Sequence, residues 1–319
     1  MNSINKLLNN FSDIILEDGH NTDYIYSLII ALFYTHCDGI NKLLNDDITI
    51  SDGYYIQEFI KTKFIYNLQK NISIMNTTIN KFRMYLYYCG WLKNESKHIL
   101  DKCNIKDFYL FLFKLLEYEI IYAKIDNLNN TTSEYKCKLI EITDEIINIE
   151  KENEINNTLN LTNLINIWVK QNITLNKQFN NNGENTLNNS INEKLNEELN
   201  KGLNEKILEQ YSYRFDKLPY LLPIYINRLN NNNIKIDIMR GFKFIDNGDK
   251  IQRMFIWELH SLICKSTKDD SYYAIVITGN NKFRKLSDKM IPSNIEINMK
   301  DDNVRNKIMM EVCFVFYKI

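Results

Sequence analysis

The spacing of apolar residues changes along the chain, and this change constrains the fold more than any other feature. In residues 1–125 apolar side chains recur at helical spacing, whereas from Tyr211 onward they form short β-like runs. The predicted helices are Tyr24–Cys37, Tyr54–Lys70, Ile79–Trp91 and Ile105–Ile121. The predicted strands are Leu221–Ile226, Phe255–Cys264, Tyr272–Thr278 and Val312–Tyr317. Helices followed by strands predict an α+β fold, in which helices pack beside a largely antiparallel sheet.

The composition narrows the class of protein. With 319 residues, 45% of them hydrophobic, the chain can bury a substantial core. Its net charge is -1 and no block of like charge stands out, so we expect neither nucleic acid nor a membrane surface as the main partner. The longest apolar run, residues 25–34, is too short to cross a bilayer. The six cysteines form no C-x-x-C pair and the N-terminus lacks the pattern of a signal peptide, which predicts an intracellular protein, cytoplasmic or nuclear and not secreted.

An Asn-rich, low-complexity stretch, residues 172–210, separates the helical part from the strands. Its second half begins with a capping-box pattern, Ser190 and Glu193, and continues with apolar residues at every fourth position. A surface helix after a loop is one interpretation of this pattern. An insertion in a tolerant loop is the interpretation that we favour.

Residues 21–33 read NTDYIYSLIIALF. This segment resembles the cysteine box of ubiquitin-specific proteases, N-T-C-Y-x-N-S followed by an apolar helix. Asp23 stands at the position of the nucleophilic cysteine, and Asp18 stands where the family supplies an oxyanion-hole asparagine. A carboxylate is a poor substitute for a thiolate, and at the second position it would repel a developing oxyanion. We expect Asp23 to cap the helix that follows, because aspartate is a preferred N-cap residue.

A second segment, NIKDF at residues 104–108, continues into an apolar helix. It is similar to the family's D-A-Q-E-F-L pattern. The resemblance places Asn104 and Asp107 at positions that contact the tail of ubiquitin in relatives.

The last hundred residues hold four further segments of this kind, LPYLLPIYINRL from 218, WELHSLICK from 257, DSYYAIV from 270 and VCFVFYK from 312. They resemble the buried strands of the protease palm. DSYYAIV is similar to G-H-Y-x-A-Y-V, which places Ser271 at the general-base histidine and Tyr272 beside the tail. FRKLSD, from 283, resembles W-Y-x-F-D-D and places Ser287 at the third catalytic position, with Asp288 as the alternative after a slip of one residue. A serine cannot accept a proton at neutral pH as imidazole does.

The order of these segments implies a single papain-like ubiquitin-specific protease fold. Its expected parts are a helical thumb (1–125), reduced and rebuilt fingers that contain the insertion (126–217) and an antiparallel palm sheet (218–319). The family's fingers often hold zinc through two C-x-x-C pairs. Only Cys137 lies in this region, so we expect neither a metal nor a cofactor.

The remaining nucleophile candidates are weak. His36 and Cys37 are adjacent, and neighbouring residues on a helix do not face each other. We assign Cys37 to the core, His98 and His260 to structural roles, and His20 to the surface near the former catalytic site.

Three functional hypotheses follow from the resemblance. The first is a catalytically inactive relative that binds ubiquitin, a ubiquitin-like protein or another protein partner. The second is a structural or assembly subunit that reuses the fold without recognising ubiquitin. The third, which the replaced residues favour least, is an active peptidase with a rearranged site. The oligomeric state stays open.

Overall fold

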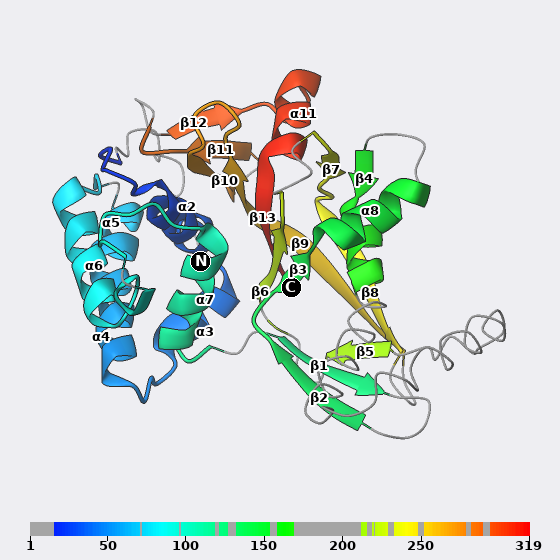
Figure 1. The fold of residues 1–319 in the computed structure, drawn as a ribbon, viewed down its shortest axis with the longest axis horizontal. Coiled ribbons are helices and arrows are strands. Elements are labelled where there is room, and N and C mark those ends of the chain that lie inside the picture. Colours follow the sequence, from blue (N-terminus) through cyan, green and yellow to red (C-terminus); the bar gives the residue numbers. More distant parts are fainter. Residues whose placement is uncertain are drawn as a thin grey trace, which may run out of the picture.

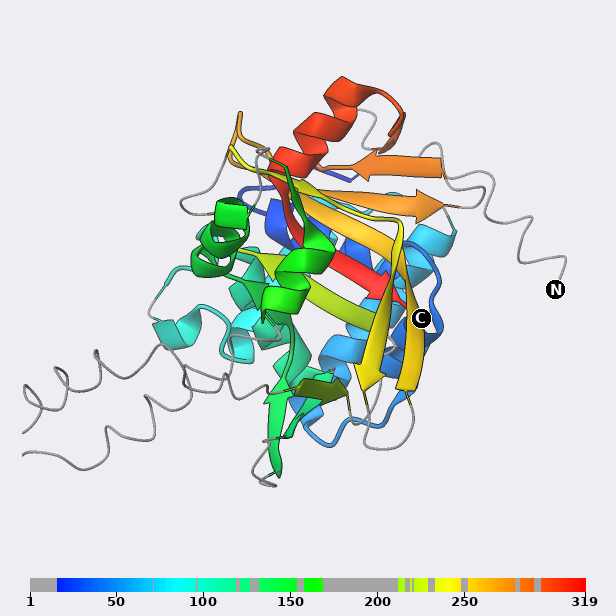
Figure 2. The ribbon, with the colours of Figure 1, turned by 90° about the vertical axis from the view of Figure 1, so that its right-hand side faces the viewer.

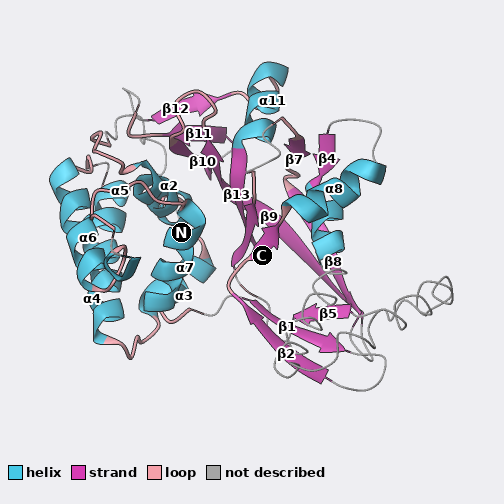
Figure 3. Ribbon diagram, viewed as in Figure 1, coloured by secondary structure: helices cyan, strands magenta, loops and turns pink. Residues whose placement is uncertain are grey.

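The computed structural model describes residues 16–70, 72–95, 97–118, 121–126, 132–153, 158–168, 212–215, 219, 221–228, 233–247, 252–278, 282–289 and 294–319. The helices of residues 23–115 gather on one side of the molecule, and the strands lie on the other side together with the helices of residues 144–153 and 302–311 (Figures 1 and 3). The predicted α+β class is therefore confirmed. The predicted insertion, residues 172–210, lies outside the described residues.

The helical part is built around α2 (Asp23–Phe33), all of whose residues are buried. One side of α2 packs on β10 and β9, and the other meets α7 and η2. The hydroxyl of Ser261, on β9, donates to the carbonyl of Ala31 at 2.6 Å and helps to hold α2 on the sheet. The helices and helical turns of this part are α2, α3 (Asp38–Asn45), α4 (Ser51–Phe59), η2 (Ile60–Ile65), α5 (Tyr66–Gln69), α6 (Asn76–Tyr88), η3 (Lys93–Glu95) and α7 (Ile105–Leu115).

The predicted helix Tyr54–Lys70 is observed as a rod in which the π-helical turn η2 separates α4 from α5. Its buried residues Ile56, Ile60, Phe64 and Leu68 recur at every fourth position. A regular α-helix has 3.6 residues per turn, so a strict spacing of four would rotate these side chains off one face. The wider π turn corrects that drift.

The main sheet has the strand order β12-β11-β10-β9-β13-β6-β3, and β8 also pairs with β9. The pairings are antiparallel, except that β3 pairs with β6 in parallel. Figure 2 shows these strands side by side, with α11 at one end. The strands are β3 (Ile140–Ile142), β6 (Leu221–Ile226), β8 (Gly241–Asn247), β9 (Gln252–Lys265), β10 (Tyr272–Thr278), β11 (Lys282–Leu286), β12 (Asn294–Ile297) and β13 (Val312–Lys318).

Smaller elements surround this sheet. They are a three-stranded sheet of β1 (Ile121–Asp126), β2 (Thr132–Cys137) and β5 (Ser212–Phe215), a parallel pair of β4 (Thr158–Asn160) and β7 (Lys235–Asp237), and the helices α8 (Asp144–Asn153) and α11 (Asp302–Glu311). In the described part of the chain, no helix has the length and apolar character needed to span a membrane.

Candidate functional site

Asp23 is the first residue of α2, and the residue at the N-cap is Thr22, whose side chain makes no capping hydrogen bond. The Asp23 carboxylate is 3% exposed, and its Oδ2 accepts a hydrogen bond from the backbone N–H of Tyr272 at 2.8 Å. The prediction that Asp23 caps the first turn is therefore wrong. Its carboxylate instead connects the start of α2 to the start of β10, 249 residues away. The hydrogen bond to this carboxylate comes from a strand N–H and not from the N–H groups of the first helical turn.

Ser271 is buried next to this contact but its hydroxyl points elsewhere. Its Oγ donates to Oδ1 of Asp269 at 2.8 Å, which holds the hydroxyl within the turn between β9 and β10. The following residue, Tyr272, is 5% exposed, and burial raises the pKa of its phenol far above the ordinary value.

Asp288 is bonded to Thr22, the residue that precedes α2. Its Oδ2 accepts a hydrogen bond from the Thr22 hydroxyl at 2.9 Å, and its buried Oδ1 has no partner among the described residues. Burial, together with the neighbouring charges of Asp23 and Asp18, raises the pKa of Asp288 to about 6. The hydroxyl of Ser287 accepts from the backbone N–H of Lys289 at 3.1 Å, so it closes its own turn. Of the two sequence alternatives, Asp288 is the one whose side chain bonds to the start of α2.

Asp18 forms an ion pair with Lys289, whose Nζ also donates to the carbonyl of Gly19 at 3.2 Å. The site thus brings together the carboxylates of Asp18, Asp23 and Asp288 with one lysine. The negative charge of Asp18 would repel an oxyanion. The buried carboxylate of Asp23 would repel a thiolate placed beside it.

Asn104 and Asp107 stand at the start of α7 and are exposed. Asn104 is the N-cap residue, and its side chain accepts from the N–H of Lys106 at 2.8 Å. Two residues before it, Lys102 reaches across to Asp270 on the turn between β9 and β10, with an Nζ to Oδ2 distance of 2.5 Å. Lys265 binds the other oxygen of Asp270 at 2.6 Å. The Lys102 pair joins the chain before α7 to the turn that carries Ser271, and the Lys265 pair holds that turn on the end of β9.

None of the four histidines is hydrogen-bonded to a cysteine or to Asp23 among the described residues. His260 is 2% exposed and lies 3.4 Å from the Leu32 carbonyl, and burial beside Lys318 lowers its pKa to about 4. His36 contacts Asn41, His98 contacts the N–H of Leu100, and His20 contacts Asn21. Within the described residues, no cluster of His, Cys, Asp and Glu is arranged to hold a metal ion.

Two further residues escaped the sequence analysis. Lys289, the only cation among the groups just described at the α2 start, directly follows the matched segment FRKLSD. Arg83 is 1% exposed, and its Nη1 donates to the carbonyl of His20 at 2.7 Å, which fixes the loop before α2. A signal for Arg83 was present, because it lies four residues after Ile79 on the apolar face of its helix.

Comparisons with known proteins support the fold and go no further. No protein-family model matches the chain, and no curated protein sequence matches it significantly. Among solved structures, the Ubp8/Sgf11/Sus1/Sgf73 DUB module of SAGA bound to ubiquitin aldehyde is 12% identical, with a TM-score of 0.59 over 98% of this chain and 70% of that chain. The module with a Ubp8 variant, bound to monoubiquitin, is 13% identical, with a TM-score of 0.56 over 97% of this chain and 69% of that chain. A yeast SAGA DUB module with an Sgf73 variant is 12% identical, with a TM-score of 0.55 over 98% of this chain and 69% of that chain.

At this level of identity the likeness shows the fold alone. The chain has the fold of the ubiquitin-specific proteases, as the segment order in the sequence predicts.

Proposed function

We propose that this chain is a catalytically silent relative of the ubiquitin-specific proteases that acts by binding a protein, with ubiquitin or a ubiquitin-like protein as the first candidate. The observation that carries this proposal is the carboxylate of Asp23. It lies at the start of α2 and is bonded to the backbone of Tyr272, and the sequence resemblance assigns it to the position of the family's nucleophile. A carboxylate so placed is a poor nucleophile toward an amide carbonyl.

The neighbouring groups support the same conclusion. The hydroxyl of Ser271 cannot serve as a general base at neutral pH, and it is already engaged with Asp269. Asp18 holds negative charge where the family donates hydrogen bonds to an oxyanion. The three catalytic roles would therefore all need other residues.

Ubiquitin is the first candidate because two of the similar structures are bound to monoubiquitin or ubiquitin aldehyde. We infer that Asn104, Asp107 and Tyr272 would line the path of the ubiquitin tail. Asn104 and Asp107 are exposed at the start of α7 and available to a partner.

The second candidate function is that of a structural or assembly subunit. The ion pairs of Asp270 favour it, because the Lys102 pair bridges the chain before α7 and the turn beside Tyr272, and the Lys265 pair holds that turn on the end of β9.

Calorimetric titration of the full chain with ubiquitin separates the two candidates. Ubiquitin should bind, and Asp107→Ala should weaken binding by roughly three- to tenfold, the value of one hydrogen bond. Asp52→Ala is the matched control, since Asp52 is also an exposed acid in the first turn of a helix, α4. The absence of binding to ubiquitin would reject ubiquitin as the partner and favour the second candidate.

A further inference from the structure

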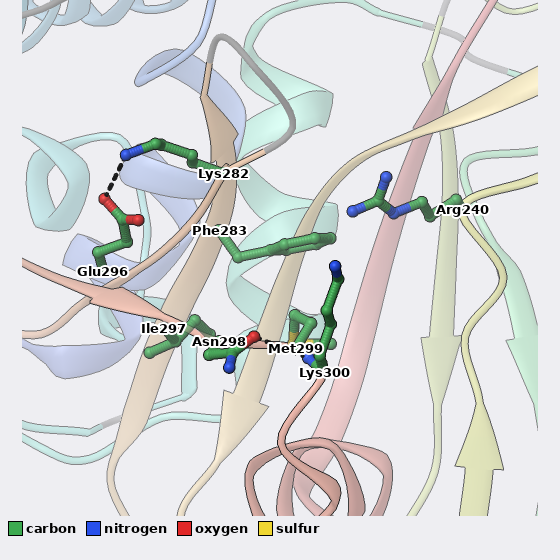
Figure 4. Close-up of a pocket in the computed structure, with 8 residues that line it drawn as sticks. All are labelled: Arg240, Lys282, Phe283, Glu296, Ile297, Asn298, Met299 and Lys300. Atoms are coloured by element: carbon green, nitrogen blue, oxygen red, sulfur yellow. Dashed lines mark hydrogen bonds and ion pairs between the residues drawn. The ribbon is translucent and has the colours of Figure 1, made fainter.

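A cavity of about 380 Å³ lies at the opposite end of β11 from Asp288. Its apolar lining comes from Phe283, Ile297 and Met299, and Phe283 and Ile297 are paired in register across β11 and β12. This volume lies at the small end of the range for binding pockets, large enough for one or two side chains. Figure 4 shows the cavity and the charged residues around it.

Two cations converge on this cavity without a carboxylate partner. The side chains of Arg240 and Lys300 point toward the same end of the Phe283 ring, whereas Lys282 points away and pairs with Glu296 at 3.1 Å (Figure 4). The guanidinium of Arg240 lies 5.2 Å from the centroid of the Phe283 ring. Among the described residues, neither Arg240 nor Lys300 forms an ion pair. Their combined positive charge suits an anionic group.

The backbone around both cations is held in place. The carbonyl of Arg240 accepts from the N–H of Leu259 at 2.7 Å, and the next residue, Gly241, comes so close to β9 that a Cβ there would lie 2.7 Å from the carbonyl oxygen of Trp257. On the other wall, the side chain of Asn298 accepts from the N–H of Lys300 at 3.0 Å. The site is therefore largely formed before any ligand arrives.

We propose that this cavity binds an extended segment of a partner protein in which an acidic and an apolar residue stand two positions apart, so that both side chains point to the same face. The carboxylate would lie between Arg240 and Lys300, and the apolar side chain on Met299 and Ile297. A peptide suits the position because β12 ends the strand order of the described sheet, and an extended chain can add to such an edge. A nucleic acid suits it less, because two cations form no track for a phosphate backbone and Arg240 already occupies the ring of Phe283. This inference does not depend on ubiquitin binding.

Fluorescence anisotropy of a fluorescein-labelled dodecapeptide with the repeat Leu-Ser-Asp-Ser, titrated with the full chain, tests the proposal. The peptide should bind, and the double change Arg240→Ala with Lys300→Ala should weaken binding about tenfold or more, because charge-assisted hydrogen bonds are lost. A peptide with the repeat Leu-Ser-Asn-Ser should bind the unmodified chain at least about tenfold more weakly. Lys282→Ala is the matched control and should change the Kd by less than about twofold, since that lysine points away.

Absence of peptide binding, equal binding of the two peptides, or an equal loss in Lys282→Ala would overturn the proposal. So would competition by inorganic phosphate at concentrations similar to the peptide, which would indicate a site for small anions. Tighter binding of a twelve-nucleotide single-stranded DNA would indicate a nucleic-acid site instead. All three substituted positions are exposed, and thermal melting of each variant confirms that a loss of binding is not a loss of folding.

Discussion

At the scale of single residues, the carboxylate of Asp23 serves the fold by joining two elements that are far apart in the sequence. Its bond to the Tyr272 N–H is buried and measures 2.8 Å. A buried backbone donor that loses its acceptor carries the full cost of desolvation. Asp23→Ala should therefore lower the free energy of unfolding by about 1–3 kcal/mol in denaturant titrations.

Asp23→Asn is the matched control for this change. It keeps an oxygen that can accept from Tyr272, so its loss should be clearly smaller than that of Asp23→Ala. Equal losses in the two variants would mean that the charge of Asp23 matters and its hydrogen bond to Tyr272 does not.

Asp288 gives the site a dependence on pH. Its folded pKa of about 6 lies above the ordinary value because of burial, so the folded state holds the proton more tightly than the unfolded state. The contribution of Asp288 to stability is therefore full at low pH and is lost as the pH rises through about 6. Asp288→Asn has no proton to lose in this range. Its free energy of unfolding, relative to that of the unmodified chain, should therefore rise by about 2 kcal/mol from pH 4 to pH 7.

Urea titrations of the unmodified chain and of Asp288→Asn at several pH values measure that difference. A difference that stays constant from pH 4 to pH 7 would show that the pKa of Asp288 is not raised by folding.

The sequence groups Asp18, Asp23, Ser271 and Ser287, with Asp288 as the alternative to Ser287. In the structure Asp288, not Ser287, bonds to the start of α2, and Asp23 bonds to the residue after Ser271. Their bonding partners could not be predicted in the same way. Thr22 and Asp288 are 266 residues apart, and no local pattern encodes a bond across that separation. The cap predicted for Asp23 failed for the same reason, because a helix propensity takes no account of a strand N–H nearby.

At the scale of elements, periodicity predicted the existence of the helices and strands well and their interruptions poorly. The predicted helix Tyr24–Cys37 ends at Phe33 in the structure, and the predicted helix Tyr54–Lys70 contains the π turn η2. In the second case the signal was present as a strict spacing of four apolar residues. Apolar residues spaced by four stay on one face of an α-helix for about two turns, and over four turns they move off that face.

The turn between β9 and β10 supplies the prediction at this scale. Asp270 has a φ of 55°, a conformation that disfavours most residues, and it holds Lys102 and Lys265 through exposed ion pairs. Asp270→Gly and Asp270→Asn both remove the ion pairs, while Gly and Asn both tolerate this backbone. Because exposed pairs contribute little, each variant should change stability by less than about 1 kcal/mol.

The two variants should nevertheless loosen the connection between the start of α7 and this turn. Hydrogen exchange at residues 98–105 and 266–272 should become faster in both variants. Faster exchange in the turn alone, with residues 98–105 unchanged, would show that the Lys102 bridge does not join the two elements.

At the scale of the whole molecule, the fold is that of the ubiquitin-specific proteases, and the start of α2 carries Asp23 bonded to the backbone of Tyr272. Restoring the nucleophile alone should not restore chemistry. Asp23→Cys should remain inactive on a fluorogenic ubiquitin amide, because none of the described histidines is bonded to position 23 and Ser271 provides no imidazole. Turnover by this single variant would mean that another residue serves as the base.

The central claim, that the chain has the protease fold without its activity, is tested most directly by incubating the unmodified chain with a fluorogenic amide of the ubiquitin C-terminus. The account predicts no release of fluorophore above that of buffer, at enzyme concentrations where an active ubiquitin-specific protease completes the reaction. Release that persists through purification and disappears when Asp23 is changed to Ala would contradict it.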